Sequence, residues 1–171
     1  MKTEYLLDQQ VGHVLAALTA QNRLIARVCL HTGLRVGDVV ALRTKDLGRQ
    51  FMVTEAKTKK RRRVGLPDAL LADIRAQAGP VWAFPGRFQG HKTRQAVWCD
   101  VKRAAKAFRL PQNVGPHSFR KVYAVELLDK YGDLRRVQRA LNHSGVETTM
   151  IYAMADRLLE AKKAAKICRR P

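Results

Sequence analysis

Residues 51–66 read FMVTEAKTKKRRRVGL, and this stretch decides the fold class. Its first part has a period of two, so that Phe51, Val53 and Glu55 share one face, as expected of a half-buried strand. Val64 marks a returning strand. The basic run KTKKRRR between them therefore predicts a hairpin with a cationic tip.

Outside this hairpin, apolar residues recur at helical spacing. The expected helices begin at or next to Asp8, Asn22, Val36, Asp68, Thr93, His117 and Asp133, and a further short helix carries Tyr152. Gly33 is expected to end the second of them. The pattern predicts a mainly α protein with a small antiparallel β-sheet, of the α+β class.

Length and composition predict one domain over residues 1–171. The chain has 46% hydrophobic residues, enough for a core, and no Pro/Gly/Ser linker long enough to divide it. No apolar run approaches the roughly 18 residues of a membrane span, and MKTEYLLDQQ does not resemble a signal peptide. Cys29, Cys99 and Cys168 are unclustered and lack metal-ligand spacing. We expect a reduced, cytoplasmic protein without disulfides, metal, cofactor or membrane contact.

The charge points to a polyanionic partner. The chain has 33 Lys and Arg against 14 Asp and Glu, a formal net charge of +19 and a pI of about 10.7. Such an imbalance causes self-repulsion, which a phosphate polymer relieves on binding. Nucleic acid is the favoured partner. A ribosomal type of structural protein and a protein that binds acidic membranes are the alternatives.

The motif TGLRVGD contains Arg35, followed three residues later by Asp38. A carboxylate at this spacing can hold a guanidinium in a fixed plane, which two-point contact with phosphate oxygens requires. The alternative is an ordinary surface pair, which contributes a few tenths of a kcal/mol.

The motif HSFR places His117 and Arg120 on one face of a helix, in its first turn after Gly115 and Pro116. Backbone N–H groups and the positive end of the helix dipole favour an anion at this position. Alone, the motif is weak, and the favoured explanation is that His117 is a local cap and Arg120 a solvated charge.

Tyr152 lies in TTMIYA, nine residues after His143. Its apolar neighbours are typical of a core tyrosine. A phenol has a pKa near 10 and needs nearby cations or a base to act as a nucleophile. The chain supplies several candidate cations, and this favours a nucleophilic role for Tyr152.

Taken together, these motifs resemble the catalytic domain of the tyrosine recombinases, the phage-type integrases. The resemblance rests on TGLRVGD, EAKTKKRRRVGLP, HSFR and LNHSGVETTMIYA, in this order, and it extends from about Leu6 to Tyr152. Many family members carry an amino-terminal helical domain that closes around DNA. This chain is expected to begin at the catalytic domain, without that domain.

The chain departs from the family pattern at three positions, of which Phe119, in place of leucine or a similar apolar residue, is a harmless exchange. Asn142 replaces the glycine that usually precedes the second histidine, and asparagine tolerates positive φ best among the other residues. Gly65 stands where valine or proline is common. This leaves the register of the catalytic lysine open: Lys57 is the preferred residue, and Lys59 and Lys60 are rivals.

The resemblance implies a site-specific DNA recombinase that needs neither ATP nor metal. Tyr152 would attack a scissile phosphodiester, forming a 3′-phosphotyrosyl bond and releasing a 5′-hydroxyl. Arg35 and Arg120 would hold the non-bridging oxygens. His143 would donate a hydrogen bond to one of them, and His117 would assist proton transfer to or from Tyr152.

The hairpin has two implied roles. Lys57 would protonate the leaving 5′-oxygen, a general-acid step that contributes about 10²–10⁴-fold. Outside the hairpin, Asp38 would orient Arg35. The expected DNA-binding residues of the hairpin are Lys59, Lys60, Arg61, Arg62 and Arg63.

The expected partners are double-stranded DNA and other protomers assembled on it. Residues 157–171 are expected to be a basic C-terminal helix or tail, whose apolar face is too small for an interface of about 1,200 Å². We therefore expect a monomer in the absence of DNA. A type IB topoisomerase-like enzyme, a telomere-resolving enzyme and a DNA-binding module that retains the site are the alternatives. The DNA sequence and the direction of the reaction stay open.

Overall fold

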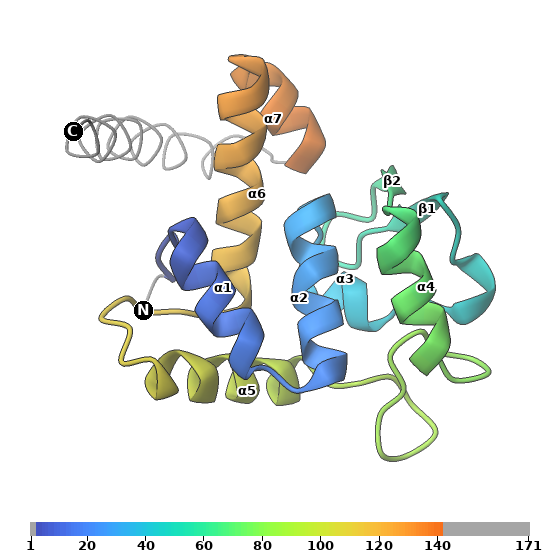
Figure 1. Cartoon of the computed structure of the whole chain (residues 1–171). Helices are drawn as coiled ribbons and strands as arrows, with labels where there is room; N and C mark the ends of the chain where they lie inside the picture. Colours follow the sequence, from blue (N-terminus) through green and yellow to red (C-terminus); the bar gives the residue numbers. More distant parts are fainter. Residues whose placement is uncertain (1–2, 142–171) are drawn as a thin grey trace, which may run out of the picture. The chain divides into compact units, whose positions relative to one another are not determined.

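The structure is a computed structural model, in which residues 3–141 are described. The helices and strands of this part (Figure 1) are α1 Asp8–Ala17, α2 Ala20–Thr32, α3 Val36–Val40, the 3₁₀ helix η1 Thr44–Asp46, β1 Gln50–Thr54, β2 Arg61–Gly65, α4 Asp68–Gln77, α5 Arg94–Ala107, α6 Pro116–Tyr131 and α7 Leu134–Leu141. The predicted α+β class is confirmed. Within residues 3–141, no helix has both the length and the hydropathy needed to cross a membrane.

The chain divides into two compact units, Met1–Tyr123 and Ala124–Pro171, with the boundary inside α6. The first unit contains the elements from α1 to α5, the hairpin and the first half of α6. The described part of the second unit is the remainder of α6 together with α7. The prediction of a single domain over residues 1–171 stays a prediction.

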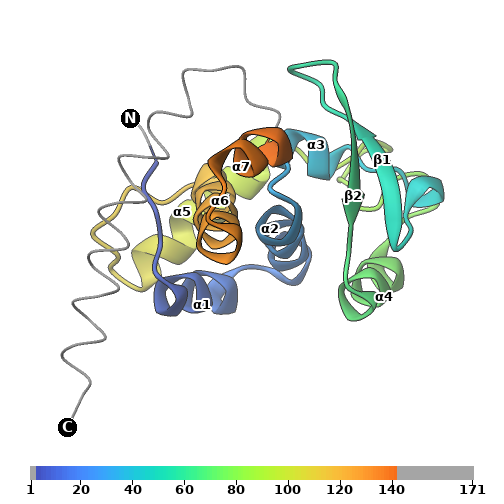
Figure 2. The same cartoon turned by 90° about the horizontal axis from the view of Figure 1, so that it is seen from above.

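The hairpin forms the predicted antiparallel sheet. Phe51 pairs with Val64, and Val53 pairs with Arg62. Phe51, Val53 and Val64 are buried, whereas Met52, Thr54, Arg61 and Arg63, which alternate with the inward-facing residues of the two strands, are exposed. Side chains alternate between the two faces of a strand, so Arg62 lies on the buried face. Figure 2 shows β2 between β1 and α2.

Helix α2 is the centre of the first unit. It contacts α1, α3, α4 and β2. Ile25, Val28 and Cys29 on this helix are almost completely buried. Gly33 ends α2 with φ of 63°, as predicted, since glycine adopts this left-handed conformation without a steric penalty.

The start of α2 differs from the prediction. Asn22 is not its cap, because the helix begins at Ala20 and Asn22 is buried inside it. The Nδ2 of Asn22 donates to Oδ2 of Asp100 on α5, at 2.7 Å. The same oxygen accepts from the backbone N and from Oγ1 of Thr19 at 3.0 and 2.9 Å. A carboxylate from a distant helix thus fixes this start.

The other predicted helix starts agree more closely. Thr93 caps α5, with its side chain accepting from the backbone N of Ala96 at 3.1 Å. Asp133 accepts from the backbone N of Arg135 at 2.8 Å at the start of α7. Asp8 is the first residue of α1 rather than its cap. At Thr93 and Asp133, a hydrogen bond from the nearby backbone to the capping side chain is sufficient to set where the helix begins.

Candidate active site

The Gly33 turn positions Arg35. After the turn, Arg35 is the N-cap of α3, with extended φ and ψ of −70° and 144°. Its backbone oxygen accepts from the N of Asp38 at 2.9 Å. Its Nη1 donates to Oε2 of Glu55 at 2.6 Å, and the two side chains are 15% and 0% exposed. Arg35 is thus held at the edge of the core with little freedom to move.

Arg120 reaches the same turn from α6. Its side chain is buried, and its Nη1 donates to the backbone oxygen of Gly33. Gly33 therefore serves both arginines, because its left-handed backbone directs the chain to Arg35 and its carbonyl holds Arg120. The structure brings together these two predicted phosphate ligands from distant parts of the sequence.

Arg62 is a third arginine at this turn. Its Nη2 donates to the backbone oxygen of Thr32. Among the described residues, its Nε and Nη1 are buried without a hydrogen-bond partner. Burial lowers the pKa of the Arg62 guanidinium, and the charge of Arg35 acts in the same direction. The charge of Glu55 opposes both effects.

This location corrects the expectation that Arg62 belongs to the DNA-binding surface of the hairpin. Val53, its strand partner, is buried, and the same face of the sheet carries the Arg62 side chain inward. The other four predicted DNA-binding residues have exposed side chains: Lys59, Lys60, Arg61 and Arg63. Their contact with DNA stays a prediction.

Lys57 lies in the turn of the hairpin, with an exposed side chain. The turn is closed by two backbone hydrogen bonds, from Glu55 N to Lys60 O at 3.0 Å and from Lys59 N to Glu55 O at 2.9 Å. Lys59 has a positive φ of 58°. The predicted placement of Lys57 on a hairpin agrees with the structure, and its preference over Lys59 and Lys60 stays a prediction.

Asp38 does not pair with Arg35, contrary to the expectation. Its Oδ1 accepts from the backbone N of Ala56 at 2.9 Å. Arg35 has extended backbone angles, so the two residues do not have the helical i,i+3 geometry. Asp38 instead anchors the hairpin turn on α3, and the guanidinium of Arg35 pairs with Glu55.

The sequence interpretation missed Glu55 as a site residue. The signal was present in the alternation, because Glu55 follows Phe51 and Val53 on the face that the structure buries. A carboxylate at a buried strand position requires partners. That requirement was the clue to an ion pair at this position.

His117 lies in the first turn of α6, with an exposed side chain. The next residue, Ser118, is buried, and its Oγ accepts from the backbone N of Gly115 at 3.3 Å. His143, Tyr152 and the segment 157–171 lie outside the described residues. Their predicted roles stay predictions.

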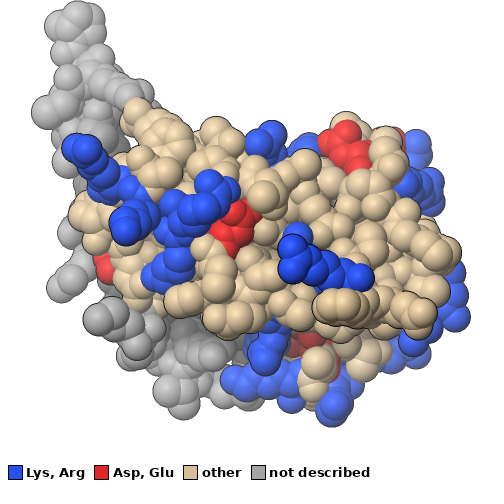
Figure 3. Space-filling view, turned by 90° about the horizontal axis from the view of Figure 1, so that it is seen from below, with Lys and Arg blue, Asp and Glu red and all other residues tan. Residues whose placement is uncertain are grey.

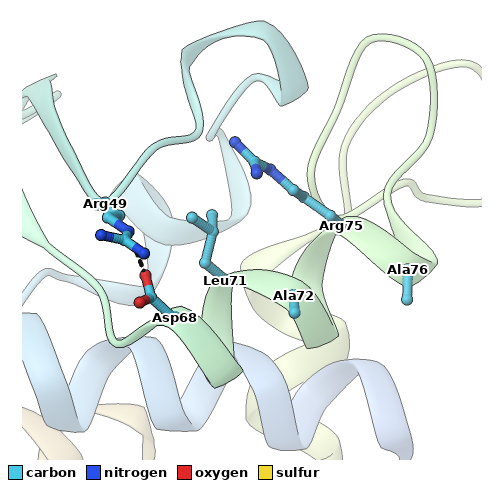
Figure 4. Close-up of a pocket in the computed structure, with 6 residues that line it drawn as sticks. All are labelled: Arg49, Asp68, Leu71, Ala72, Arg75 and Ala76. Carbon is cyan, nitrogen blue, oxygen red and sulfur yellow. Dashed lines mark ion pairs between the residues drawn. The ribbon is translucent and has the colours of Figure 1, made fainter.

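Among the described residues, neither the potential metal ligands nor an open hollow forms a second candidate site. The described residues contain no group of three or more His, Cys, Asp or Glu side chains that could hold a metal ion. An open hollow (Figure 4) is lined by Arg49, Asp68, Leu71, Ala72, Arg75 and Ala76. The side chains of its one ion pair, from Arg49 Nε to Asp68 Oδ1 at 2.6 Å, are 78% and 63% exposed. The hollow shares no residue with the Gly33 turn.

The surface reflects the excess of positive charge. Figure 3 shows one face on which Lys and Arg side chains gather in several groups with few Asp or Glu side chains among them. Uniform net charge over a surface raises the local concentration of a polyanion. The positive charge of the protein is thus not confined to the arginines at the Gly33 turn.

Comparison with known proteins shows which family the chain belongs to. The sequence model of the Phage integrase family matches residues 4–158. A putative integrase/recombinase, y4qK, of Sinorhizobium fredii is 35% identical over 156 residues, covering 86% of this chain and 51% of the relative. Tyrosine recombinase XerC of Xanthomonas axonopodis is 32% identical over 149 residues, covering 82% and 49%. The chain spans about half the length of the curated relatives that it matches.

Solved structures share the fold. XerA recombinase superposes with a TM-score of 0.74 at 21% identity, covering 94% of this chain and 63% of that one. A λ integrase dimer bound to a COC′ core site also has a TM-score of 0.74, at 19% identity, with 88% and 48% covered. The mostly helical fold with its two-stranded sheet is that of the tyrosine recombinase catalytic domain. The chain belongs to the phage integrase family.

Proposed function

We propose that this chain is the catalytic domain of a site-specific DNA recombinase, which cleaves and rejoins DNA through a 3′-phosphotyrosyl intermediate. The observation that carries the proposal is the convergence of Arg35 and Arg120 on the Gly33 turn. The net charge of +19 supports DNA as the substrate. Relatives named as tyrosine recombinases and integrases support the reaction type.

The two arginines bind the non-bridging oxygens of the scissile phosphate. Arg35 is pre-oriented by Glu55, and this bond uses one of the five N–H donors of the guanidinium. The remaining donors suit two-point binding of phosphate. Since both arginines are fixed before the substrate arrives, they stabilise the developing charge with little reorganisation, and no metal ion is needed for that task.

In the covalent step, the phenolic oxygen of Tyr152 attacks phosphorus and the bond to the 5′-oxygen breaks. Lys57 donates a proton to that leaving oxygen, and His117 assists removal of the phenolic proton. His143 donates a hydrogen bond to a non-bridging oxygen. Attack of a 5′-hydroxyl on the phosphotyrosyl bond reverses the step, so the bond energy is retained and ATP is not required.

We further propose that the chain is monomeric in solution and assembles with other protomers on DNA. Recombination exchanges four DNA strands, and each protomer supplies one tyrosine, so several protomers are needed. The λ integrase structure is a dimer bound to DNA, and this supports the same behaviour here. Light scattering of the chain with and without its DNA site measures both states, and a stable dimer without DNA would contradict the proposal.

The test of the reaction is capture of a covalent adduct. The full chain is incubated, in excess EDTA, with nicked duplexes whose sequence around the nick is randomised, and adducts are resolved on a denaturing gel. Wild-type protein is expected to form an adduct, whereas Tyr152→Phe is expected to bind DNA without forming one. An adduct in Tyr152→Phe, or activity only with added magnesium, would contradict the proposal. Relaxation of plasmid without a selected site would favour a type IB topoisomerase instead.

A further inference from the structure

Glu55 lies immediately after β1 and is completely buried. A buried carboxylate is stable only with good hydrogen-bond partners, since burial removes its hydration. Its Oε2 accepts from Arg35 Nη1 at 2.6 Å and from Thr58 Oγ1 at 2.9 Å. One oxygen atom thus joins a proposed phosphate ligand to the residue that follows Lys57.

The backbone of Glu55 also closes the turn. Its N–H donates to Lys60 O at 3.0 Å, and its carbonyl accepts from Lys59 N at 2.9 Å. The flanking Ala56 N donates to Oδ1 of Asp38 on α3. The Lys57 turn is therefore fixed at its base on both sides, while the Lys57 side chain itself is exposed.

A negative charge next to a phosphate ligand opposes phosphate binding, so this carboxylate needs an explanation. Arg62 and Arg120 donate to the carbonyls of Thr32 and Gly33, and Arg35 directly follows this turn. These three arginines leave the group positively charged despite Glu55 and Asp38. Glu55 is buried beneath the turn, so it acts on the arginine and the hairpin and not on DNA. Positioning is the role that this location allows.

We propose that Glu55 is a positioning residue that holds Arg35 and the Lys57 turn in one register. The non-bridging oxygens and the leaving 5′-oxygen of one phosphate are then engaged together. This inference rests on the proposed function, because it assigns Glu55 a part in the same reaction. A shift of about 1 Å in a positioned group reduces a rate by about 10²-fold.

The experiment compares four full-length variants by the rate of adduct formation under single-turnover conditions. Glu55→Ala removes both hydrogen bonds, and a decrease of about 10²-fold is expected. Glu55→Gln keeps an oxygen acceptor, so it is expected to stay within about tenfold of wild type, that is within roughly 1.4 kcal/mol. Thr58→Val removes the contact between Glu55 and the hairpin while leaving Arg35 paired with Glu55, and it also removes the acceptor of the 3.4 Å hydrogen bond from Lys60 N. Asp73→Asn is the matched control, because Asp73 forms an exposed pair with Arg27 and its loss changes the net charge equally.

Two altered substrates distinguish the effect of Glu55 on Arg35 from its effect on the Lys57 turn. A 5′-bridging sulfur leaves without needing a proton, so it removes the demand on Lys57. A methylphosphonate lacks one non-bridging oxygen and its charge, so it reduces the demand on Arg35. Each is expected to recover part of the rate of Glu55→Ala. The sulfur substrate alone is expected to recover Thr58→Val.

Two kinetic outcomes overturn the inference: Glu55→Ala reacting as fast as Asp73→Asn, or neither altered substrate recovering the rate of Glu55→Ala. If Glu55→Ala does not fold, as judged by its melting temperature, Glu55→Gln and Thr58→Val give the same decision through the sulfur substrate. Amide hydrogen exchange provides a readout that does not need activity. Faster exchange at Ala56 and Lys59 in Glu55→Ala, relative to Asp73→Asn, is expected, and unchanged exchange overturns the inference.

This readout separates the two proposals. Absence of an adduct from the wild-type chain would contradict the proposed function, and hydrogen exchange would still decide whether Glu55 fixes the turn. An adduct from wild type with full activity in Glu55→Ala would contradict the positioning role alone. The two failures are therefore distinguishable.

Discussion

Two buried polar clusters in the first unit have different compositions and different consequences. Asp100 on α5 accepts five hydrogen bonds, from Thr19, Asn22 and Arg103. The cluster at the Gly33 turn instead combines three arginines with Glu55 and Asp38, and two donors of Arg62 lack a partner among the described residues.

The difference shows how a stabilising cluster is distinguished from a binding one. In the Asp100 cluster, one carboxylate is saturated with donors and balanced by Arg103. The buried atom of this cluster that lacks a partner among the described residues is Oδ1 of Asn22, an acceptor, so the cluster offers no free donor to an anion. The Gly33 cluster has more positive than negative charge and donors that remain unpaired, which costs folding free energy. Such a cost is expected where an anion completes the set of interactions.

The largest expected effect is on the rate of adduct formation, with no matching effect on stability. Lys57→Ala is expected to slow adduct formation by about 10²–10⁴-fold, because it removes a general acid. Its exposed side chain contributes little to folding, so the urea midpoint is expected to stay unchanged. A 5′-bridging sulfur should restore the rate.

The matched controls are Lys59→Ala and Lys60→Ala, which are expected to change DNA affinity with little change in the single-turnover rate. Rescue of Lys60→Ala by the sulfur substrate, and not of Lys57→Ala, would show that the catalytic lysine is Lys60. The difference between the Asp100 cluster and the Gly33 cluster would still hold, because Lys57, Lys59 and Lys60 all lie in the same hairpin turn.

The opposite behaviour is expected of the Asp100 cluster. Asp100→Asn removes the carboxylate from Arg103, Thr19 and Asn22 and is expected to reduce the free energy of unfolding by about 2–4 kcal/mol. The adduct rate per folded molecule should not change. Urea titration and active-site titration measure the two quantities. Lost activity in fully folded Asp100→Asn would contradict the division into two roles.

The same carboxylate predicts a dependence of stability on pH. Burial alone would raise the pKa of Asp100, but hydrogen bonds from Asn22, Thr19 and Arg103 outweigh it and lower the pKa from 3.8 to about 2. The folded state therefore binds the proton less tightly than the unfolded state. Asp100 stabilises the fold by about 2 kcal/mol above pH 4, and this contribution is lost as the pH falls towards 2. Denaturation curves of wild type and Asp100→Asn should converge over that range.

The smallest expected effect is at the residue that serves both arginines. Gly33→Ala places a Cβ at φ of 63° and is expected to cost about 1–2 kcal/mol of stability. Gly33→Asn is the control, since asparagine tolerates this region better. Because Arg35 and Arg120 both depend on the turn, the adduct rate should fall more in the alanine variant than in the asparagine variant. Equal rates would contradict the shared role of Gly33.

The sequence alone determined the class of the fold and supplied the candidate site as a prediction. A period of two between Phe51 and Glu55, followed by a basic run, specifies a hairpin, and helical spacing with Thr93 and Asp133 specifies helices. Arg35, Lys57 and Arg120 were identified from short motifs in order along the chain. These signals are local, so they survive without knowledge of the tertiary contacts.

The tertiary structure alone decided which partner each polar side chain takes. Glu55 holds Arg35 in place of Asp38, and Arg62 turns inward to the Thr32 carbonyl. Asn22 lies within α2 because Asp100, far away in the sequence, approaches it. Periodicity tells which face a residue occupies, whereas a hydrogen bond depends on distances of about 3 Å between groups from separate elements. Those distances are fixed only when the helices and the hairpin pack together.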